Sequence, residues 1–532
     1  MIFFKRHYIT IVLGLVLALM VVFSFSTLLT RPKLWSDEAM SIELARNFLH
    51  QQVLNIQIAP GVFYDFPYLV QPTGYPVTVP LAGVFKFFGQ GLFQARLYML
   101  IWMIGMVIMV FVTARRLFGK KQALAAVALI ITLASFYGSG RTVVGEIPGF
   151  TFLLFGLYLL VKQRSHLGLG VFWGLAIVSK PSVFAMLVPA VCLVLLLESG
   201  NLINKFRHIW MVAVGMLPAG ILSIFFMISH PFSREPWVGI MHFFQNPYSS
   251  SSIPSNMAHN LSATIGSTTF LYFGFLFAVV VVARFLSQPQ KVPGGLLRRS
   301  NFGYEGWINP CDESTLSGGW IPPHEIQNRK GQRLLSRGAP QEQKNLLFIY
   351  NFVLVYSILA FVYYLRSPGW IRYILIAELL ILFILPNAIG VIISRLKQYS
   401  LVNRFREELL LYGVVALFVF IQTVQLFTGA QLYKSSSALQ TAKFVNEQFP
   451  GASVANFYSL EVSVLLQTEQ RFNVADFVGM PLIGSDPLPS GELPAVIVVN
   501  LDYQSIAQTV ASIEKRYQPL RQIGQYIVYS KI

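Results

Sequence analysis

Long apolar stretches, separated by short polar or charged segments, occupy most of this 532-residue chain. A helix needs about 20 apolar residues to cross the hydrocarbon core of a bilayer. The pattern therefore predicts about eleven transmembrane helices. They lie at residues 8–29, 95–113, 122–138, 147–161, 167–179, 182–197, 209–229, 266–286, 346–365, 371–393 and 409–428. The fifth and sixth are either two short helices or one element bent at Pro181.

The pattern changes near residue 434, where short β-rich runs replace the long apolar stretches. These runs are "SVANFY", "AVIVVN" and "QYIVYS", and "TAKFVNEQF" and "SIAQTVASIEKRY" have helical spacing between them. We therefore expect a transmembrane module over residues 1–430 and a small α/β domain over 431–532. Inside the module, residues 31–90 form a long loop with amphipathic helices, and residues 284–346 form an irregular insert without periodicity.

Composition places the chain among polytopic membrane proteins. Charged residues make up 12% of it, against about 25% in soluble domains, and the mean hydropathy is +0.58. The net charge of +17 does not indicate a nucleic-acid partner, because Lys and Arg collect in the cytoplasmic loops of membrane proteins. The first apolar run is too long for the core of a signal peptide and reads as a retained helix.

The basic loops predict the orientation. The short segments "FKRH", "ARRLFGKK", "VKQRSH", "NKFRH" and "SRLKQYSLVNRFR" all fall on one side of the predicted topology, as does the 284–346 insert. This side is cytoplasmic by the positive-inside rule. Loop 31–90 and the C-terminal domain then lie outside the cytoplasm. The predicted location is a plasma membrane, most simply the inner membrane of a bacterium.

Two neighbouring acids, Asp37 and Glu38, follow the first span. After them, apolar residues within 39–49 form a stripe along one side of a helix, and Glu43 and Arg46 lie on the opposite side. This pattern predicts an amphipathic helix on the outer membrane surface. Ser36 is a suitable N-cap, and acids in the first turn suit the helix dipole. The same pair is also a candidate for chemistry. Both interpretations stand, since a helix start holds a carboxylate rigidly.

The other candidates are Glu146 and four cations. An ionisable group at membrane depth is a functional candidate by default, so Glu146 is either a site residue or the partner of Arg141. Lys180 either extends to the interface or meets an anionic lipid headgroup. Arg366 and Arg372 flank a Pro-Gly turn and either anchor the helix ends or bind a phosphate in bidentate fashion.

The predicted topology places all seven of these side chains on the outer side. Carboxylates and cations at a membrane surface suit glycosyl transfer from a lipid-linked phosphate. A carboxylate takes the proton of an acceptor hydroxyl. The departing phosphate is stabilised by the cations, or by a divalent ion (Mg or Mn) bound by Asp37 and Glu146.

The order of motifs resembles that of the GT-C membrane glycosyltransferases, in the branch of the protein O-mannosyltransferases and lipid A aminoarabinose transferase. The motifs are "LWSDEAMSIELARNFL", "QPTGYPVTVPLAGVFKFFG", "GRTVVGEIPGFTFLLFGLYLL", "GLAIVSKPSVFAMLVPA" and "WIRYILIAELLILFILP". The resemblance implies a polyprenyl-phosphate sugar donor and inverting transfer on the extracytoplasmic face. It places Asp37, Glu146 and Lys180 at the family's site positions. One departure is Gln71-Pro72-Thr73, where many members have Lys-Pro-Pro with a lysine that meets the donor phosphate.

The resulting hypothesis is an enzyme of the cell envelope that transfers a hexosyl or pentosyl unit to a hydroxyl of a lipid, glycan or protein acceptor. Asp37, Glu38 and Glu146 are its candidate catalytic residues, and the cations are its candidate phosphate ligands. Two alternatives remain. One is a polysaccharide ligase or polymerase, and the other is a transporter or flippase of lipid-linked sugars, although the symmetric halves typical of transporters are not visible.

Overall fold

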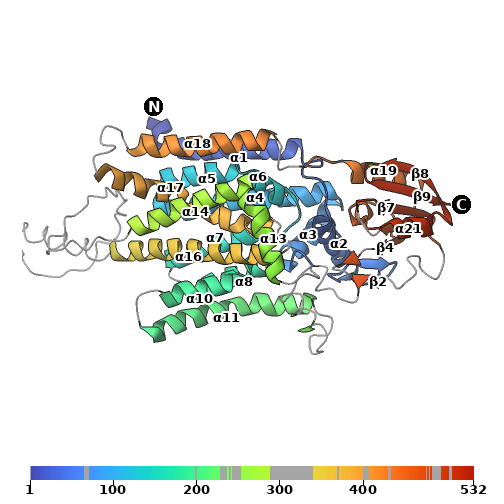
Figure 1. Cartoon of the computed structure of the whole chain (residues 1–532), viewed down its shortest axis with the longest axis horizontal. Coiled ribbons are helices and arrows are strands. Elements are labelled where there is room, and N and C mark those ends of the chain that lie inside the picture. Colours follow the sequence, from blue (N-terminus) through green and yellow to red (C-terminus); the bar gives the residue numbers. More distant parts are fainter. Residues whose placement is uncertain are drawn as a thin grey trace, which may run out of the picture.

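Helices run side by side along the long axis of the molecule, and a β-sheet lies at one end (Figure 1). The N-terminus lies at the opposite end of the helices. This computed structural model describes residues 2–64, 71–163, 165–197, 201–227, 237–238, 241, 253–287, 339–367, 371–398, 407–428, 433–474, 476–477, 480–481, 493–502 and 506–532. Most of the predicted 284–346 insert lies outside the described residues.

Every predicted apolar stretch contains a helix. The helices are α1 (Ile2–Ser26), α4 (Leu92–Phe118), α5 (Lys120–Ile131), α6 (Ala134–Arg141), α7 (Glu146–Gln163), α8 (His166–Ser179), α9 (Pro181–Phe184), α10 (Leu187–Leu197), α11 (Leu202–Met227), α14 (Thr268–Leu286), α16 (Ala339–Arg366), α17 (Leu375–Gln398) and α18 (Glu407–Thr428). A further helix, α13 (Ile253–Ile265), lies outside the predicted stretches. The predicted membrane-embedded helical fold is therefore present.

The predicted number of spans has only partial support. Among the described residues, six helices are long and apolar enough to cross a membrane, or seven if α5 and α6, bent by 70° at their junction, form one span. Helix α8 and the α9–α10 segment fall in a shorter class of 10–17 residues. They are short because the chain breaks at Lys180-Pro181, where proline removes a backbone donor. This settles the open choice in favour of two short helices.

The helix core is centred on α17, whose apolar stretch is 83% buried. It packs against α5, α14, α16 and α18. Small residues allow other helices to approach closely, as is common in membranes. A Cβ atom on Gly170 of α8 would lie 2.2 Å from the carbonyl oxygen of Val212 in α11. The bundle therefore has a closely packed interior rather than a loose set of spans.

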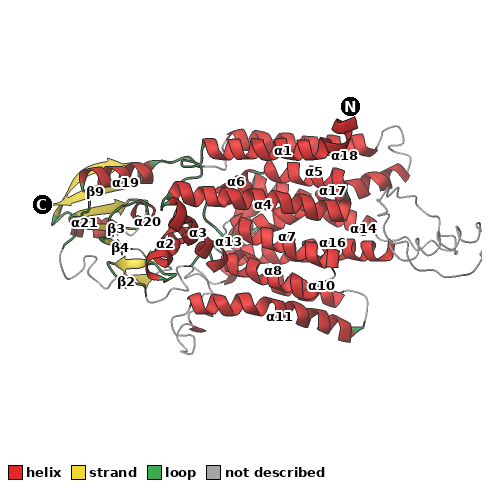
Figure 2. Cartoon of the chain, turned by 180° about the vertical axis from the view of Figure 1, so that it is seen from behind, coloured by secondary structure: helices red, strands yellow, loops and turns green. Residues whose placement is uncertain are grey.

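The predicted α/β character of the C-terminal residues is visible in Figure 2. Five strands form one sheet in the order β4-β3-β7-β9-β8, with β3 parallel to β4 and β7, and β9 antiparallel to its neighbours. The strands are β3 (Val454–Phe457), β4 (Arg471–Val474), β7 (Val496–Asn500), β8 (Tyr517–Ile523) and β9 (Tyr526–Lys531). The accompanying helices are α19 (Ser437–Gln448), α20 (Leu460–Ser463) and α21 (Ile506–Ile513). All three predicted strands and both predicted helices are present. The domain boundary at 430/431 stays a prediction.

Helix α2 (Ser36–Gln51) lies between the sheet and the transmembrane helices, beside α3 (Tyr75–Phe88) and the short strands β1 (Gln57–Ala59) and β2 (Val62–Phe63). One apolar cluster joins residues of α2, α3 and α4 to residues of α19, α20 and the sheet. The expected helix on an exposed membrane surface is therefore wrong in one respect. The polar face of α2 is buried as well, including Glu43 and Arg46. Ser36 is also not the N-cap: Trp35 occupies that position without a side-chain hydrogen bond.

Candidate active site

Asp37 lies at the centre of a three-residue charge cluster. Its Oδ2 accepts a hydrogen bond of 2.7 Å from Nη1 of Arg372 and one of 3.2 Å from Nζ of Lys180. The side chain of Lys180 is 2% exposed, and those of Asp37 and Arg372 are 16% and 15% exposed. Tertiary structure thus assembles a first-turn acid of α2, the break between α8 and α9, and the short 3₁₀ turn at Ile371–Tyr373.

The position of Lys180 follows from the chain break. Helix α8 ends at Ser179 because the residue before a proline is disfavoured in the helical region, and Lys180 has φ −151° and ψ 82°. Two glycines contact this break. A Cβ on Gly74 would lie 1.9 Å from the carbonyl oxygen of Val178, and one on Gly145 would lie 1.8 Å from that of Ser179. The backbone of Gly74 also donates to the Ser179 carbonyl at 3.2 Å. Only glycine fits at either position.

Neither glycine was among the predicted site residues. The available signal was their place in the chain: Gly145 immediately precedes Glu146, and Gly74 follows the Gln71-Pro72-Thr73 departure. A close backbone approach is one of the standard reasons for a glycine beside a functional side chain, but nothing in one sequence says which segment approaches.

The Gly145→Ala variant is expected to displace Lys180 and to lower donor-dependent transfer by roughly 10²-fold, since a shift of about 1 Å in a positioned group can cost that much. The matched control is Gly105→Ala in α4, where no heavy atom lies within 4 Å of the place that the added methyl group would take. Transfer rates of both purified variants test this. Equal activity of the two variants would contradict the role assigned to Gly145.

The electrostatics keep Asp37 ionised. Burial acts to raise its pKa, but the charges and hydrogen bonds of Lys180 and Arg372 outweigh burial and lower the pKa below its ordinary value of 3.8. The guanidinium of Arg372 lies 4.6 Å from the ring centroid of Trp35, a cation–π contact that orients it. Asp37 is therefore a charged carboxylate at neutral pH, paired with two cations.

Glu146 is a second carboxylate near this cluster. It is the first residue of α7, where the helix dipole favours negative charge, and it is fully buried. Its charge interacts with that of Arg372. Both carboxylate oxygens lack a hydrogen-bond partner within the part of the chain that the structure describes. Since a buried unpaired acceptor costs free energy, Glu146 is suited to accept hydrogen bonds from a bound molecule.

Glu38 does not join Asp37. Its two oxygens accept hydrogen bonds of 2.8 Å and 2.6 Å from Nε and Nη2 of Arg96 in α4, and neither side chain of this pair is exposed. Arg96 also donates to the carbonyl of Leu28. The predicted catalytic role of Glu38 is not supported by this geometry, which makes it the residue that attaches α2 to the transmembrane helices.

The predicted phosphate ligands divide in a similar way. Arg141 donates to the Thr27 hydroxyl and to the carbonyls of Phe23 and Arg31, so it holds the end of α1 rather than facing Asp37 or pairing with Glu146. Its pairing with Glu146 was a wrong alternative. Arg366 is the last residue of α16 and is not among the groups that bond Asp37. Lys180 and Arg372 remain as phosphate candidates.

Gln71, where the predicted resemblance implies a lysine in many members, bonds backbone groups of this chain. Its Nε2 donates to the carbonyls of Leu54 and Phe226 at 2.7 Å and 3.0 Å. It therefore ties the first loop to α11. Of the predicted phosphate ligands, Lys180 and Arg372 are the two that contact Asp37.

The predicted metal site at Asp37 and Glu146 fits poorly with the donor set. Two cations already bond Asp37 Oδ2, and their charges would repel a nearby divalent ion. Mg and Mn prefer several oxygen ligands, and among the described residues no group of three His, Cys, Asp or Glu side chains is close enough to bind one ion.

Comparison with known proteins adds three findings. Residues 77–225 match the family model described as dolichyl-phosphate-mannose-protein mannosyltransferase. The fold is similar to crystal structures of ArnT from Cupriavidus metallidurans. With undecaprenyl phosphate bound, the TM-score is 0.53 at 12% identity, covering 98% of both chains; in the apo state it is 0.56 at 14% identity, covering 98% of this chain and 97% of the other. No curated protein sequence matches.

These similarities bear directly on the predicted resemblance. The family match covers α3 to α11, the segment that contains Glu146 and Lys180. The structural match covers the transmembrane helices and the C-terminal sheet together. The chain therefore has the fold of the GT-C glycosyltransferases of the protein O-mannosyltransferase and ArnT type.

Proposed function

We propose that the chain is an inverting glycosyltransferase that moves a hexosyl or pentosyl unit from a polyprenyl-phosphate donor to a hydroxyl of a lipid, glycan or protein acceptor. The observation behind this proposal is the contact of one carboxylate, Asp37, with two cations, Lys180 and Arg372. Beside them lies Glu146, whose carboxylate oxygens have no hydrogen-bond partner among the described residues. The bound undecaprenyl phosphate in the ArnT crystal structure supports a lipid phosphate as the donor class.

The chemistry follows from the three side chains. The donor phosphate accepts hydrogen bonds from Lys180 and Arg372 and competes with Asp37 for them, which frees Oδ2. The carboxylate then takes the proton of the acceptor hydroxyl as its oxygen bonds to the anomeric carbon. The bond from that carbon to the phosphate oxygen breaks at the same time. The lipid phosphate leaves with the electron pair, stabilised by the two cations.

Glu146 is proposed to bind a hydroxyl of the sugar or of the acceptor. A substrate hydroxyl would satisfy an oxygen that has no partner among the described residues. Such a hydrogen bond orients the reacting groups, and no proton is transferred to Glu146. Glu146 is therefore assigned to orientation and Asp37 to proton transfer.

The proposed location is the bacterial plasma membrane, with the site facing outside. Helix α4 begins beside α3 at the site end, and its 27 residues rise about 40 Å. Its last turn, with Arg115 and Arg116, therefore lies at the opposite end, as the positive-inside rule expects for a cytoplasmic surface. About eleven spans, counting the short helices, are part of this proposal.

The test is to incubate the purified protein with a panel of polyprenyl-phosphate sugars and candidate acceptors, with and without a chelator. Mass spectrometry identifies a product, and the added mass separates one sugar from a whole glycan, which would indicate a ligase or polymerase. Uptake of lipid-linked sugar in sealed vesicles without a covalent product would indicate a transporter and contradict the proposal. Loss of activity with the chelator would restore the metal prediction.

The Lys180→Met variant is expected to raise the donor KM by about 10-fold, since a charge-assisted hydrogen bond is worth roughly 1.5–3 kcal/mol. It is also expected to change the pH profile. In the wild type the lowered pKa of Asp37 keeps the base form down to below pH 3.8, so kcat/KM loses activity only at lower pH. Removing one of the two lowering charges shifts this acidic limb to higher pH. A limb that moves to lower pH, or an unchanged KM, would contradict the contact.

A further inference from the structure

The C-terminal sheet makes buried ionic contacts with α2, the helix that holds Asp37. In strand β4, Arg471 Nη1 and Nη2 donate to the two carboxylate oxygens of Glu43 at 3.0 Å and 3.3 Å, and neither side chain is exposed. Arg471 also donates to the carbonyl of Ser463 in α20, at 3.1 Å. Glu43 in turn accepts from Asn47, one turn further along α2. The ion pair therefore fixes one face of α2 to the sheet.

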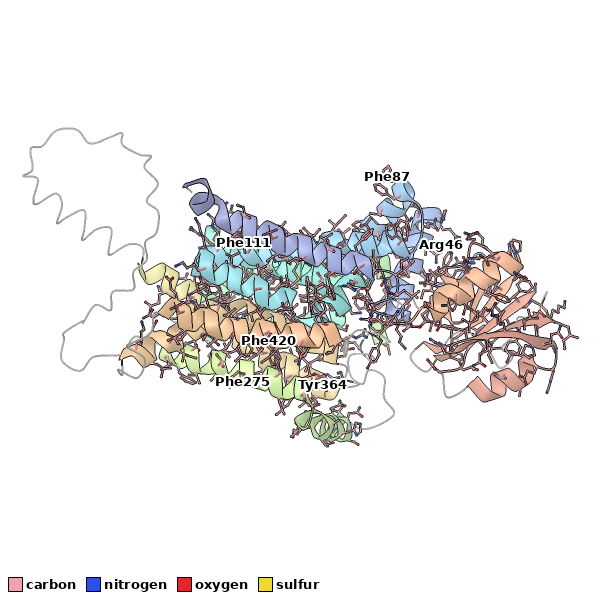
Figure 3. All side chains as sticks on the ribbon, turned by 90° about the horizontal axis from the view of Figure 1, so that it is seen from above. Arg46, Phe87, Phe111, Phe275, Tyr364 and Phe420 are labelled. Atoms are coloured by element: carbon pink, nitrogen blue, oxygen red, sulfur yellow. The ribbon has the colours of Figure 1, made fainter. Side chains whose placement is uncertain are left out.

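Neighbouring contacts extend this attachment. Arg46 donates to the Leu466 carbonyl at 3.3 Å and pairs with Glu469, in the turn before β4. Asn473 of β4 donates to the carbonyl of Gln57, in the first outer loop, at 2.7 Å. Figure 3 shows Arg46 where the helices meet the C-terminal residues. Strand β4 thus contacts both α2 and β1, the strand that follows α2 in the chain.

The second attachment of α2 is on its other side, through Glu38 and Arg96 of α4. Glu38 is next to Asp37 in the chain. Glu43 lies about 9 Å from Asp37 along the helix axis, because six residues rise about 1.5 Å each. The apolar cluster holds α2 between the sheet and the helices, but apolar contacts are not directional. Two buried ion pairs to different bodies fix both the rotation of α2 and the direction of its first turn.

A buried ion pair is not a strong source of stability. Well-packed apolar residues of similar size often replace such a pair without loss, while the pair restricts geometry more narrowly. Its presence at this junction is therefore better explained by geometry than by stability. We infer that Arg471, through Glu43, is a positioning residue for Asp37, so that the C-terminal sheet is a working part of the active site. This inference rests on the proposed function.

The main test compares the wild type with the double variant Glu43→Leu/Arg471→Met. The double variant is expected to fold, because it leaves no unpaired buried charge, and to lose about 10-fold or more in kcat with the donor KM changed less than 3-fold, as expected of a loss confined to the transition state. The control is Lys443→Met in α19, whose contact with Glu447 is exposed; it should keep wild-type kcat. A double variant with full kcat would overturn the inference.

Two further measurements separate positioning from folding and from the proposed function. The single variant Arg471→Lys keeps the charge, so its kcat should be higher than that of the double variant. If folded Arg471→Lys protein has a kcat as low as the double variant, the result counts against the inference. Asp37 and Lys180 meet through the long lysine side chain, whereas a direct disulfide needs Cβ atoms about 3.5–4.5 Å apart. Cysteines at positions 37 and 180 are therefore joined with a short bifunctional thiol crosslinker, and crosslinking should be several-fold slower in the double variant than in the wild-type background. This readout needs no sugar transfer. Equal crosslinking rates would overturn the inference even if the proposed function holds, and absent transfer with slower crosslinking would overturn only the function.

Discussion

Sugar transfer by the Asp37→Asn variant is expected to fall by about 10³-fold, within the 10²–10⁴-fold range of a lost general base. The amide is nearly isosteric with the carboxylate but accepts no proton at neutral pH. Membrane insertion and folding should be retained, because Asp37 is 16% exposed and is not part of the buried pair that attaches α2. The measurement is the single-turnover rate with a donor identified by the panel assay.

Donor binding distinguishes the assigned role of Asp37 from a structural one. In Asp37→Asn, no carboxylate at position 37 competes with the donor phosphate for Lys180 and Arg372. The donor should therefore bind as tightly as in the wild type or a few-fold more tightly. Weaker donor binding together with reduced transfer would mean that Asp37 organises the phosphate site instead of acting on the acceptor. Full transfer activity would remove the catalytic assignment.

The Arg96→Leu variant is expected to lose about 3–5 kcal/mol of folding stability, because it leaves the carboxylate of Glu38 buried and unpaired. Both side chains of this pair are fully buried. Yield of monodisperse protein in detergent and the thermal unfolding midpoint would report the loss. The exposed pair of Lys121 and Glu408 gives the matched control, since Lys121→Leu should change stability by less than about 1 kcal/mol.

Replacing both partners gives a second result. The Glu38→Leu/Arg96→Met double variant should regain most of the lost stability, because no buried charge is left without a partner. It should also retain measurable transfer, since in this geometry Glu38 does not contact the reacting groups. If the double variant is stably folded but as inactive as Asp37→Asn, Glu38 takes part in the chemistry and its structural assignment is wrong.

The sequence alone predicted the apolar helices and three of the five strands of the main sheet; β4 and β8 were not predicted. Membrane helices are visible in a sequence because lipid demands long apolar segments with internally paired backbones. The number of true spans was harder to predict, because length does not reveal that α8 and α9–α10 separate at Lys180-Pro181 or that α5 and α6 bend by 70°. The β-rich runs of the last hundred residues could also be predicted, because a strand is indicated by a short run of neighbouring apolar and β-branched residues.

The partners of the charged residues were decided by the tertiary structure. Asp37, Lys180 and Arg372 were all predicted site residues, and the fold brings them into contact across separations of 143 and 335 residues. Glu38 and Arg141 had the same chemical character and the same predicted side of the membrane, yet they bond Arg96 and the end of α1. One sequence records which residues can ionise, but not which other charge each one meets. That choice depends on how the helices pack.

The same limit applies to α2, where the opening acids of the first loop lie. Its apolar stripe and its acidic first turn were readable, because helix periodicity and the helix dipole are local properties. The polar face was expected to contact water, and instead the sheet covers it through Arg471. Burial of charge is favourable only when a matching charge is present, and here that charge comes from a strand more than four hundred residues away, which only the folded chain brings to the helix.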